Sequence, residues 1–162
     1  MNRIEKGSLL VLAIIVAFNI FFGLGSIPLL DPDEPVYAET AREMIQFNDY
    51  LSPRIYNEYW FDKPPMYYWL VAGAMHVFGD GEFAARFPAA LMAFLTVIML
   101  YCSITRLFNE RTGFWSALVL ATSVQFFYLG KAAVTDTTLL FFLTGSLSVS
   151  YTHLTLPTNS LV

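Results

Sequence analysis

The chain has 162 residues, of which 56% are hydrophobic and 17% aromatic, and its mean hydropathy is +0.54. These values exceed those of an ordinary soluble domain and point to a polytopic membrane protein. The net charge of −4 argues against nucleic acid as a partner, because such binding needs a basic surface. The single cysteine, Cys102, lies in an apolar run and cannot form an intramolecular disulfide.

Four apolar runs predict an all-α fold with several membrane spans. The expected spans are residues 8–30, 87–105, 112–130 and 137–149, all approximate and the last one short. Arg3 and Lys6 precede the first span, and Arg106 and Arg111 flank the turn after the second, so the positive-inside rule places both regions in the cytoplasm. A cleaved signal peptide is the alternative for the first run, although its apolar region is normally shorter.

Residues 31–86 then form an external loop, in which we expect two juxtamembrane helices. Pro35 suits an early helical position, because its missing N–H costs nothing there, and the helix would run to about Phe47. Its apolar and charged faces predict that it lies along the membrane surface. Pro64 precedes a second apolar helix, Met66 to Phe78, which is short for a span and is interpreted as interfacial or partly inserted.

Several charged residues gather on the external side of this topology. Asp33 and Glu34 begin the first external helix, Asp62 and Lys63 precede the second, and Asp136 follows the third span. The acids could simply cap helices or mark the water boundary, and the lysine could extend to the membrane surface. The functional alternative is a carboxylate that activates an acceptor, together with a lysine that binds phosphate.

The remaining candidates indicate no cofactor. Arg42 and Arg86 could pair with nearby acids or with a lipid phosphate, whereas His76 and His153 are too isolated to make a metal motif. The sequence also has no phosphate-binding loop, nucleophile elbow or dinucleotide fingerprint. We therefore expect neither a metal nor a soluble nucleotide cofactor.

Four motifs along residues 1–147 resemble those of bacterial lipid-linked glycosyltransferases, namely the aminoarabinose transferases of lipid A and their protein O-mannosyltransferase-like relatives. The motifs are Pro-Asp-Glu-Pro-x-Tyr-Ala-Glu-x-x-Arg-Glu-Met at 32–44, Asp-Lys-Pro-Pro-x-Tyr-x-Trp-Leu at 62–70, Phe-x-x-Arg-x-Pro at 83–88, and Thr-Asp at 135–136. Val36 stands where some aminoarabinose transferases carry a basic residue, and the motif spacing suits the broader family equally well.

The resemblance implies a GT-C fold, with many spans, external loops over a cavity and a polyprenyl-phosphate sugar as donor. Asp33 falls on the catalytic acid of the family, and Asp136 on its second important acid, with Glu34 as a further catalytic candidate. Lys63 falls on the lysine that contacts the lipid phosphate, with Arg42 and Arg86 as further candidates. Tyr37 and Asp62 are the candidate cavity-lining residues.

The resulting hypothesis is a glycosyltransferase of the bacterial inner membrane that passes a sugar to a lipid or protein acceptor on the external face. A transporter or flippase using surface carboxylates and a non-catalytic membrane subunit are the alternatives. The acids cluster at one surface rather than within the spans, which favours the enzyme. Residues 148–162 resemble translated sequencing-adaptor sequence, so we expect an inactive N-terminal fragment with an artefactual tail.

Overall fold

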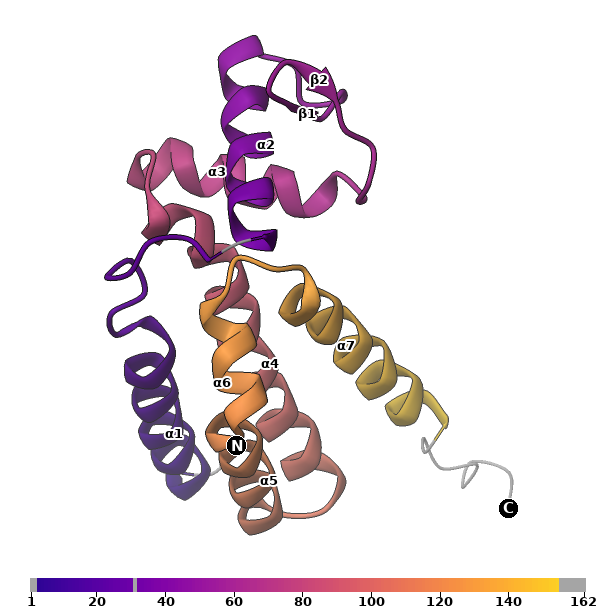
Figure 1. The fold of residues 1–162 in the computed structure, drawn as a ribbon. Coiled ribbons are helices and arrows are strands. Elements are labelled where there is room, and N and C mark those ends of the chain that lie inside the picture. The colour runs from indigo at the N-terminus through magenta and orange to yellow at the C-terminus, as the bar shows by residue number, and fades with distance from the viewer. Residues whose placement is uncertain (1–2, 31, 155–162) are drawn as a thin grey trace.

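The computed structural model describes residues 3–30 and 32–154. Its elements are α1 (Arg3–Phe21), α2 (Asp33–Phe47), β1 (Arg54–Ile55), β2 (Glu58–Tyr59), α3 (Met66–Phe78), α4 (Glu82–Leu107), α5 (Glu110–Thr122), α6 (Val124–Lys131) and α7 (Asp136–Leu154). α2, α3 and the strands form a compact group at one end of the longer helices (Figure 1). Apart from one hairpin, the regular secondary structure of the described residues is thus helical, which confirms the predicted all-α class.

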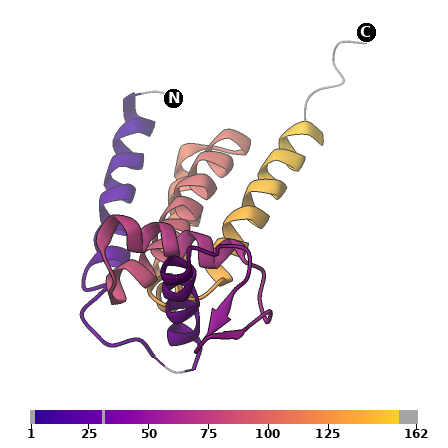
Figure 2. The same ribbon diagram turned by 90° about the horizontal axis from the view of Figure 1, so that it is seen from above.

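Helix α4 is the centre of the fold and contacts α1, α3, α5, α6 and α7. Seen from above, α1 and α7 lie on opposite sides of the helices between them (Figure 2). The 26 residues of α4 extend about 39 Å, which exceeds the hydrocarbon thickness of a bilayer. Among the described residues, α4 is the one unbroken helix long and apolar enough to cross a membrane. It begins at Glu82, several residues before the start of the predicted span.

The predicted third span is two helices, α5 and α6, which meet at a bend of 65°. Ser123, between them, has an extended backbone, and its side chain accepts a hydrogen bond from the Phe126 amide at 3.4 Å. A serine in this position caps the start of a helix. Thr122 and Ser123 therefore interrupt an otherwise apolar run, and α5 and α6 are long and apolar enough to cross a membrane only together, as a bent pair.

The first and last apolar runs also differ in length from the predicted spans. α1 ends at Phe21, and the remainder of the run, residues 22–30, leaves the helix through Gly23, whose φ is +67°. α7 begins at Asp136 and continues to Leu154, beyond the expected end of the fourth span. Of the tail that the sequence analysis sets apart, residues 155–162 lie outside the described residues.

Close packing between α4 and α5 depends on Gly113. A Cβ atom there would meet the side chain of Thr105 and would lie 3.0 Å from the carbonyl oxygen of Tyr101. Both contacts are too close for ordinary packing, so this position admits a glycine but no larger residue without a shift of one helix.

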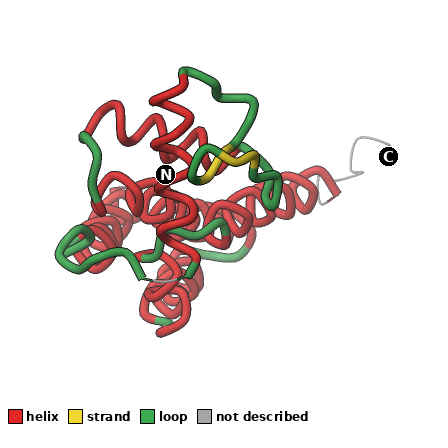
Figure 3. The backbone as a smooth tube through the Cα atoms, turned by 45° about the horizontal axis from the view of Figure 1, so that its top comes forward, coloured by secondary structure: helices red, strands yellow, loops and turns green. Residues whose placement is uncertain are grey.

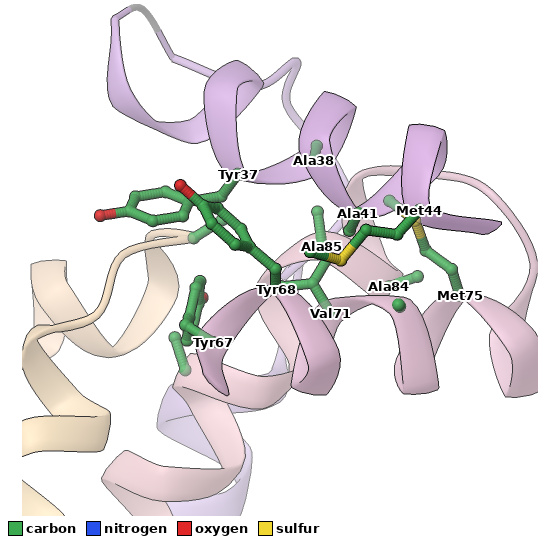
Figure 4. Packing of buried hydrophobic residues seen from close by; sticks show 13 residues of the cluster. Tyr37, Ala38, Ala41, Met44, Tyr67, Tyr68, Val71, Met75, Ala84 and Ala85 are labelled. Atoms are coloured by element: carbon green, nitrogen blue, oxygen red, sulfur yellow. The ribbon is translucent and has the colours of Figure 1, made fainter. Parts of the chain in front are cut away.

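The predicted boundaries of the two external helices are confirmed. α2 ends at Phe47, followed by Asn48 with φ of +50°, and α3 spans Met66–Phe78 as expected. Figure 4 shows the core between α2, α3 and the start of α4. Three tyrosines occupy one end of this core, and methionines and alanines fill the other. The apolar face of α2 is therefore buried against other helices of the chain.

The β1–β2 hairpin was not predicted. Its turn residues, Tyr56 and Asn57, both have positive φ angles, of 54° and 68°, as a tight two-residue hairpin requires. The carboxylate of Glu43 on α2 accepts a hydrogen bond from the Asn57 amide at 3.1 Å. This contact holds the hairpin beside α2 (Figure 3).

Candidate functional site

A buried ion pair lies where the outer group of helices meets the longer helices. Arg86, on α4, is 2% exposed and Glu34, in the first turn of α2, is 4% exposed. Arg86 Nε donates to Glu34 Oε1 at 2.9 Å, and Arg86 Nη2 donates to Oε2 at 2.7 Å. This two-point geometry matches the planar guanidinium to the carboxylate and is the strongest form of such a pair.

Arg86 uses its other donors on the segment between α1 and α2. Nη1 donates to the carbonyl oxygens of Leu24 at 3.1 Å and Ile27 at 2.8 Å, and Nη2 donates to that of Pro28 at 2.9 Å. These bonds and the two to Glu34 account for all five N–H groups of the guanidinium. No donor of Arg86 is therefore left for a lipid phosphate in this arrangement.

Glu34 is equally well bound. In addition to Arg86, its Oε1 accepts from the Ala133 amide at 2.6 Å and its Oε2 from the Leu30 amide at 2.7 Å. Burial alone would raise the pKa of Glu34, but the hydrogen bonds from Arg86 and the two amides, with the charge of Arg86, outweigh it and lower the pKa below its ordinary value of 4.5. Glu34 is thus held as a carboxylate that joins three segments.

The other two acids predicted to be catalytic, Asp33 and Asp136, lie close in sequence to residues that Glu34 joins. Asp33 precedes Glu34, and Asp136 begins α7 three positions after Ala133. Both are exposed, and neither carboxylate has a hydrogen-bond or ion-pair partner among the described residues. Two free carboxylates therefore stand on segments that Glu34 links to each other.

Three tyrosines lie next to these acids. The Tyr37 ring packs edge-on against that of Tyr67 with centroids 5.1 Å apart, and lies 5.7 Å from that of Tyr68. Burial and then the neighbouring Tyr37 raise the pKa of Tyr67, with smaller contributions from the negative charges of Glu34 and Asp136. Ala133, in the segment that leads into α7, belongs to the same buried cluster as the three tyrosines, so the tyrosine group adjoins both acidic segments.

Lys63 and Asp62 lie in the loop before α3 and are both about half exposed. Lys63 Nζ is 3.4 Å from Asp62 Oδ2, a loose ion pair that leaves the ammonium accessible. Burial, then Tyr37 and Asp62, raise the pKa of Tyr68 to about 12. The loop with Lys63 thus lies next to the same tyrosine group, two members of which, Tyr67 and Tyr68, are on α3.

Arg42 is not part of this arrangement. Its Nε and Nη2 donate to the Asp80 carboxylate at 2.7 and 3.0 Å, and its Nη1 donates to Glu39 at 2.8 Å. These contacts tie the middle of α2 to the turn between α3 and α4. Arg42 also lines a cavity of about 340 Å³ with Val36 and Tyr56.

A second cavity contains a residue that the sequence analysis did not select. It has a volume of about 380 Å³ and is lined by Glu34, Arg86 and Lys131 among other residues. Lys131 Nζ donates to the Phe22 carbonyl at 2.7 Å and lies 4.7 Å from the centroid of the Phe127 ring. In the sequence, Lys131 is marked out only as a lysine that follows an apolar run.

Two further predictions concern cavity lining and metals. Tyr37 and Asp62 line neither of these two cavities. Within residues 3–30 and 32–154, no three His, Cys, Asp or Glu side chains are grouped so that they could hold a metal ion.

Comparison with known proteins gives consistent matches. The family described as dolichyl-phosphate-mannose-protein mannosyltransferase matches residues 62–160. Among curated proteins, the undecaprenyl phosphate-alpha-4-amino-4-deoxy-L-arabinose arabinosyl transferase of Yersinia enterocolitica is 33% identical over 92% of this chain and 27% of its own length. The protein of the same description from Photorhabdus laumondii is 28% identical, over 93% of this chain and 27% of its own length.

Two crystal structures of ArnT from Cupriavidus metallidurans, one in the apo state and one bound to undecaprenyl phosphate, have the same arrangement of elements. Each aligns with a TM-score of 0.82 and 26% identity over 88% of this chain, which corresponds to 27% and 26% of the respective ArnT chains. The chain therefore spans about a quarter of the length of the proteins that it matches. This likeness confirms the GT-C-like fold class.

Proposed function

Because this chain belongs to the dolichyl-phosphate-mannose-protein mannosyltransferase family, we propose that it is part of an enzyme that transfers a sugar from a polyprenyl-phosphate carrier to an acceptor. The donor class is supported by the undecaprenyl phosphate-linked sugar named for the arabinosyl transferase of Yersinia enterocolitica and by the undecaprenyl phosphate in one similar structure. The acceptor is a lipid or protein outside the cytoplasm, and the site lies on the periplasmic face of the inner membrane.

The observation that carries the proposal is the pair of free acids, Asp33 and Asp136, on segments linked through Glu34. In the proposed reaction, an acceptor oxygen or nitrogen attacks the anomeric carbon of the sugar. The bond from that carbon to the phosphate oxygen breaks, and polyprenyl phosphate leaves with the bonding electrons. Asp33 receives the proton of the acceptor, and Asp136 assists by its charge at the developing positive centre.

Lys63 has the complementary role at the leaving group. Its ammonium is exposed, its one partner in the described part of the chain is 3.4 Å away, and its loop adjoins the tyrosine group near both acids. A lysine in such a position binds a phosphate as a point charge and stabilises the negative charge that grows there as the bond breaks. Arg42 and Arg86 are already bound by carboxylates, so we assign the phosphate role to Lys63 alone.

The test uses the full-length protein purified in lipid nanodiscs. It is supplied with undecaprenyl-phosphate 4-amino-4-deoxy-L-arabinose or with polyprenyl-phosphate mannose, and with a mixture of lipid A and periplasmic protein as acceptors. We expect transfer from one of these donors, detected by mass spectrometry as a sugar added to the acceptor with release of polyprenyl phosphate. Intact donor in both reactions, from a folded protein, would overturn the proposed function.

A further inference from the structure

The Glu34 carboxylate connects the two segments that carry the exposed acids. It belongs to the residue next to Asp33, and its Oε1 accepts from the amide of Ala133, three residues before Asp136. Its Oε2 accepts from the amide of Leu30, in the segment that leads into α2. One buried side chain thus sets how the start of α2 lies against the start of α7.

Arg86 fixes that carboxylate in turn. Its guanidinium is rigid and planar, it binds both oxygens of Glu34, and it sits on α4, which packs against most of the other helices. Its remaining donors hold the carbonyls of Leu24, Ile27 and Pro28. The carboxylate therefore has no freedom to rotate without breaking several charged hydrogen bonds at once.

We propose that the Glu34–Arg86 pair is a positioning device that fixes the separation of Asp33 and Asp136. This inference rests on the proposed function, and it gives Glu34 and Arg86 roles different from acid–base catalysis and phosphate binding. Asp33 and Asp136 have no partner of their own among the described residues, so the backbone of their two segments sets the region that each carboxylate can reach. Turnover is sensitive to such placement, since a displacement of about 1 Å can cost roughly 100-fold.

The kinetic test compares Glu34→Gln with Glu43→Gln in the full-length protein. Glu43 is also a buried glutamate of α2 that accepts a backbone amide, but that amide belongs to the hairpin and not to the segments carrying the acids. We expect Glu34→Gln to lower kcat by roughly 10- to 100-fold while the KM for donor changes little. Glu43→Gln should retain most of the turnover.

A double variant separates positioning from an independent structural effect. If Glu34 acts by placing Asp33, the loss caused by Asp33→Asn should be much smaller in the Glu34→Gln background than in the wild type. If the fold losses in turnover of the two single variants simply multiply in the double variant, the proposal is overturned. Full activity of Asp33→Asn alone would instead remove the proposed role of Asp33, and the distance measurement below would still decide whether Glu34 positions the two segments.

The distance measurement needs no activity. Spin labels are placed at positions 33 and 136 of the full-length protein, from which Cys102 and any other reactive cysteine have been removed, and the distance distribution is recorded by double electron–electron resonance. A broader or shifted distribution in Glu34→Gln, with Glu43→Gln unchanged, supports the proposal. An identical distribution in folded wild type and Glu34→Gln refutes it. If Glu34→Gln does not accumulate, Glu34→Asp, which retracts the carboxylate by one methylene, decides by the same criteria.

Discussion

Replacing Arg86 with methionine should destabilise the protein far more than any exposed arginine would. The change leaves Glu34 as a buried carboxylate with only the Leu30 and Ala133 amides, and it removes a donor from the buried Leu24 carbonyl. Losing one partner of a buried ion pair costs about 3–5 kcal/mol. A buried carbonyl without a donor adds about 1 kcal/mol, so we expect a total loss of about 4–6 kcal/mol.

The matched control is Arg42→Met, which removes the same charge from an ion pair whose arginine is 42% exposed. Exposed pairs contribute about 0–1 kcal/mol, so this variant should be close to wild type. Unfolding is followed by circular dichroism during titration of mixed micelles with denaturing detergent. Equal destabilisation by Arg86→Met and Arg42→Met would refute the view that the buried pair organises the fold.

The remaining predictions concern pH, packing and donor binding. The folded-state pKa of Glu34 lies below its ordinary value of 4.5, so its stabilising contribution is present above pH 4.5 and is lost as the pH falls through the folded-state pKa. The stability of Glu34→Gln, measured by acid unfolding, should therefore depend less on pH than that of the wild type. Gly113→Ala should cost about 1–3 kcal/mol by overpacking α4 against α5, whereas Gly73→Ala, with open space around its Cβ, should be neutral or slightly stabilising in the same unfolding assay. Lys63→Ala should weaken donor binding roughly 10- to 100-fold through loss of a charged phosphate contact, as measured by titration with undecaprenyl phosphate; unchanged affinity would remove the lysine from the site.

The external helices could be predicted from the sequence because their boundaries depend on local chemistry. Pro32 and Asn48 bracket α2, and Pro65 and Gly79 bracket α3, so each limit is set by one or two neighbouring residues. The apolar faces of both helices are also local patterns. What local patterns do not reveal is the partner of each face, and the apolar face of α2 packs against α3 and α4 within the chain.

Other features depend on contacts between distant residues. Glu34 and Arg86 are 52 positions apart, and the sequence allowed Arg86 to pair with an acid but did not identify Glu34 as that acid. The bend at Ser123 was missed because two small polar residues barely alter the mean hydropathy of the run. The hairpin was missed because its strands have two residues each, and its turn residues, Tyr56 and Asn57, include no glycine.

The candidate site was predicted in part. The sequence, through its motifs, selected both free acids and Lys63: Asp33 and Lys63 stand beside prolines, and Asp136 follows an apolar run. It could not tell that Asp33 is free and Glu34 is bound. The two residues are adjacent, and they differ in that the side chain of Glu34 is buried whereas that of Asp33 is exposed. It also gave no reason to select Lys131, which lines the same cavity as Glu34.

The most direct test of the central claim is the turnover of Asp33→Asn in the full-length protein. The variant keeps the size of the side chain and removes its negative charge and its ability to accept a proton. Asp80→Asn, which alters an exposed acid bound to Arg42, is the control. With saturating undecaprenyl-phosphate 4-amino-4-deoxy-L-arabinose, or with the donor that the wild type accepts, we predict a loss of about 10²–10⁴-fold for Asp33→Asn and nearly full activity for Asp80→Asn. Turnover of Asp33→Asn equal to that of the wild type would contradict the account.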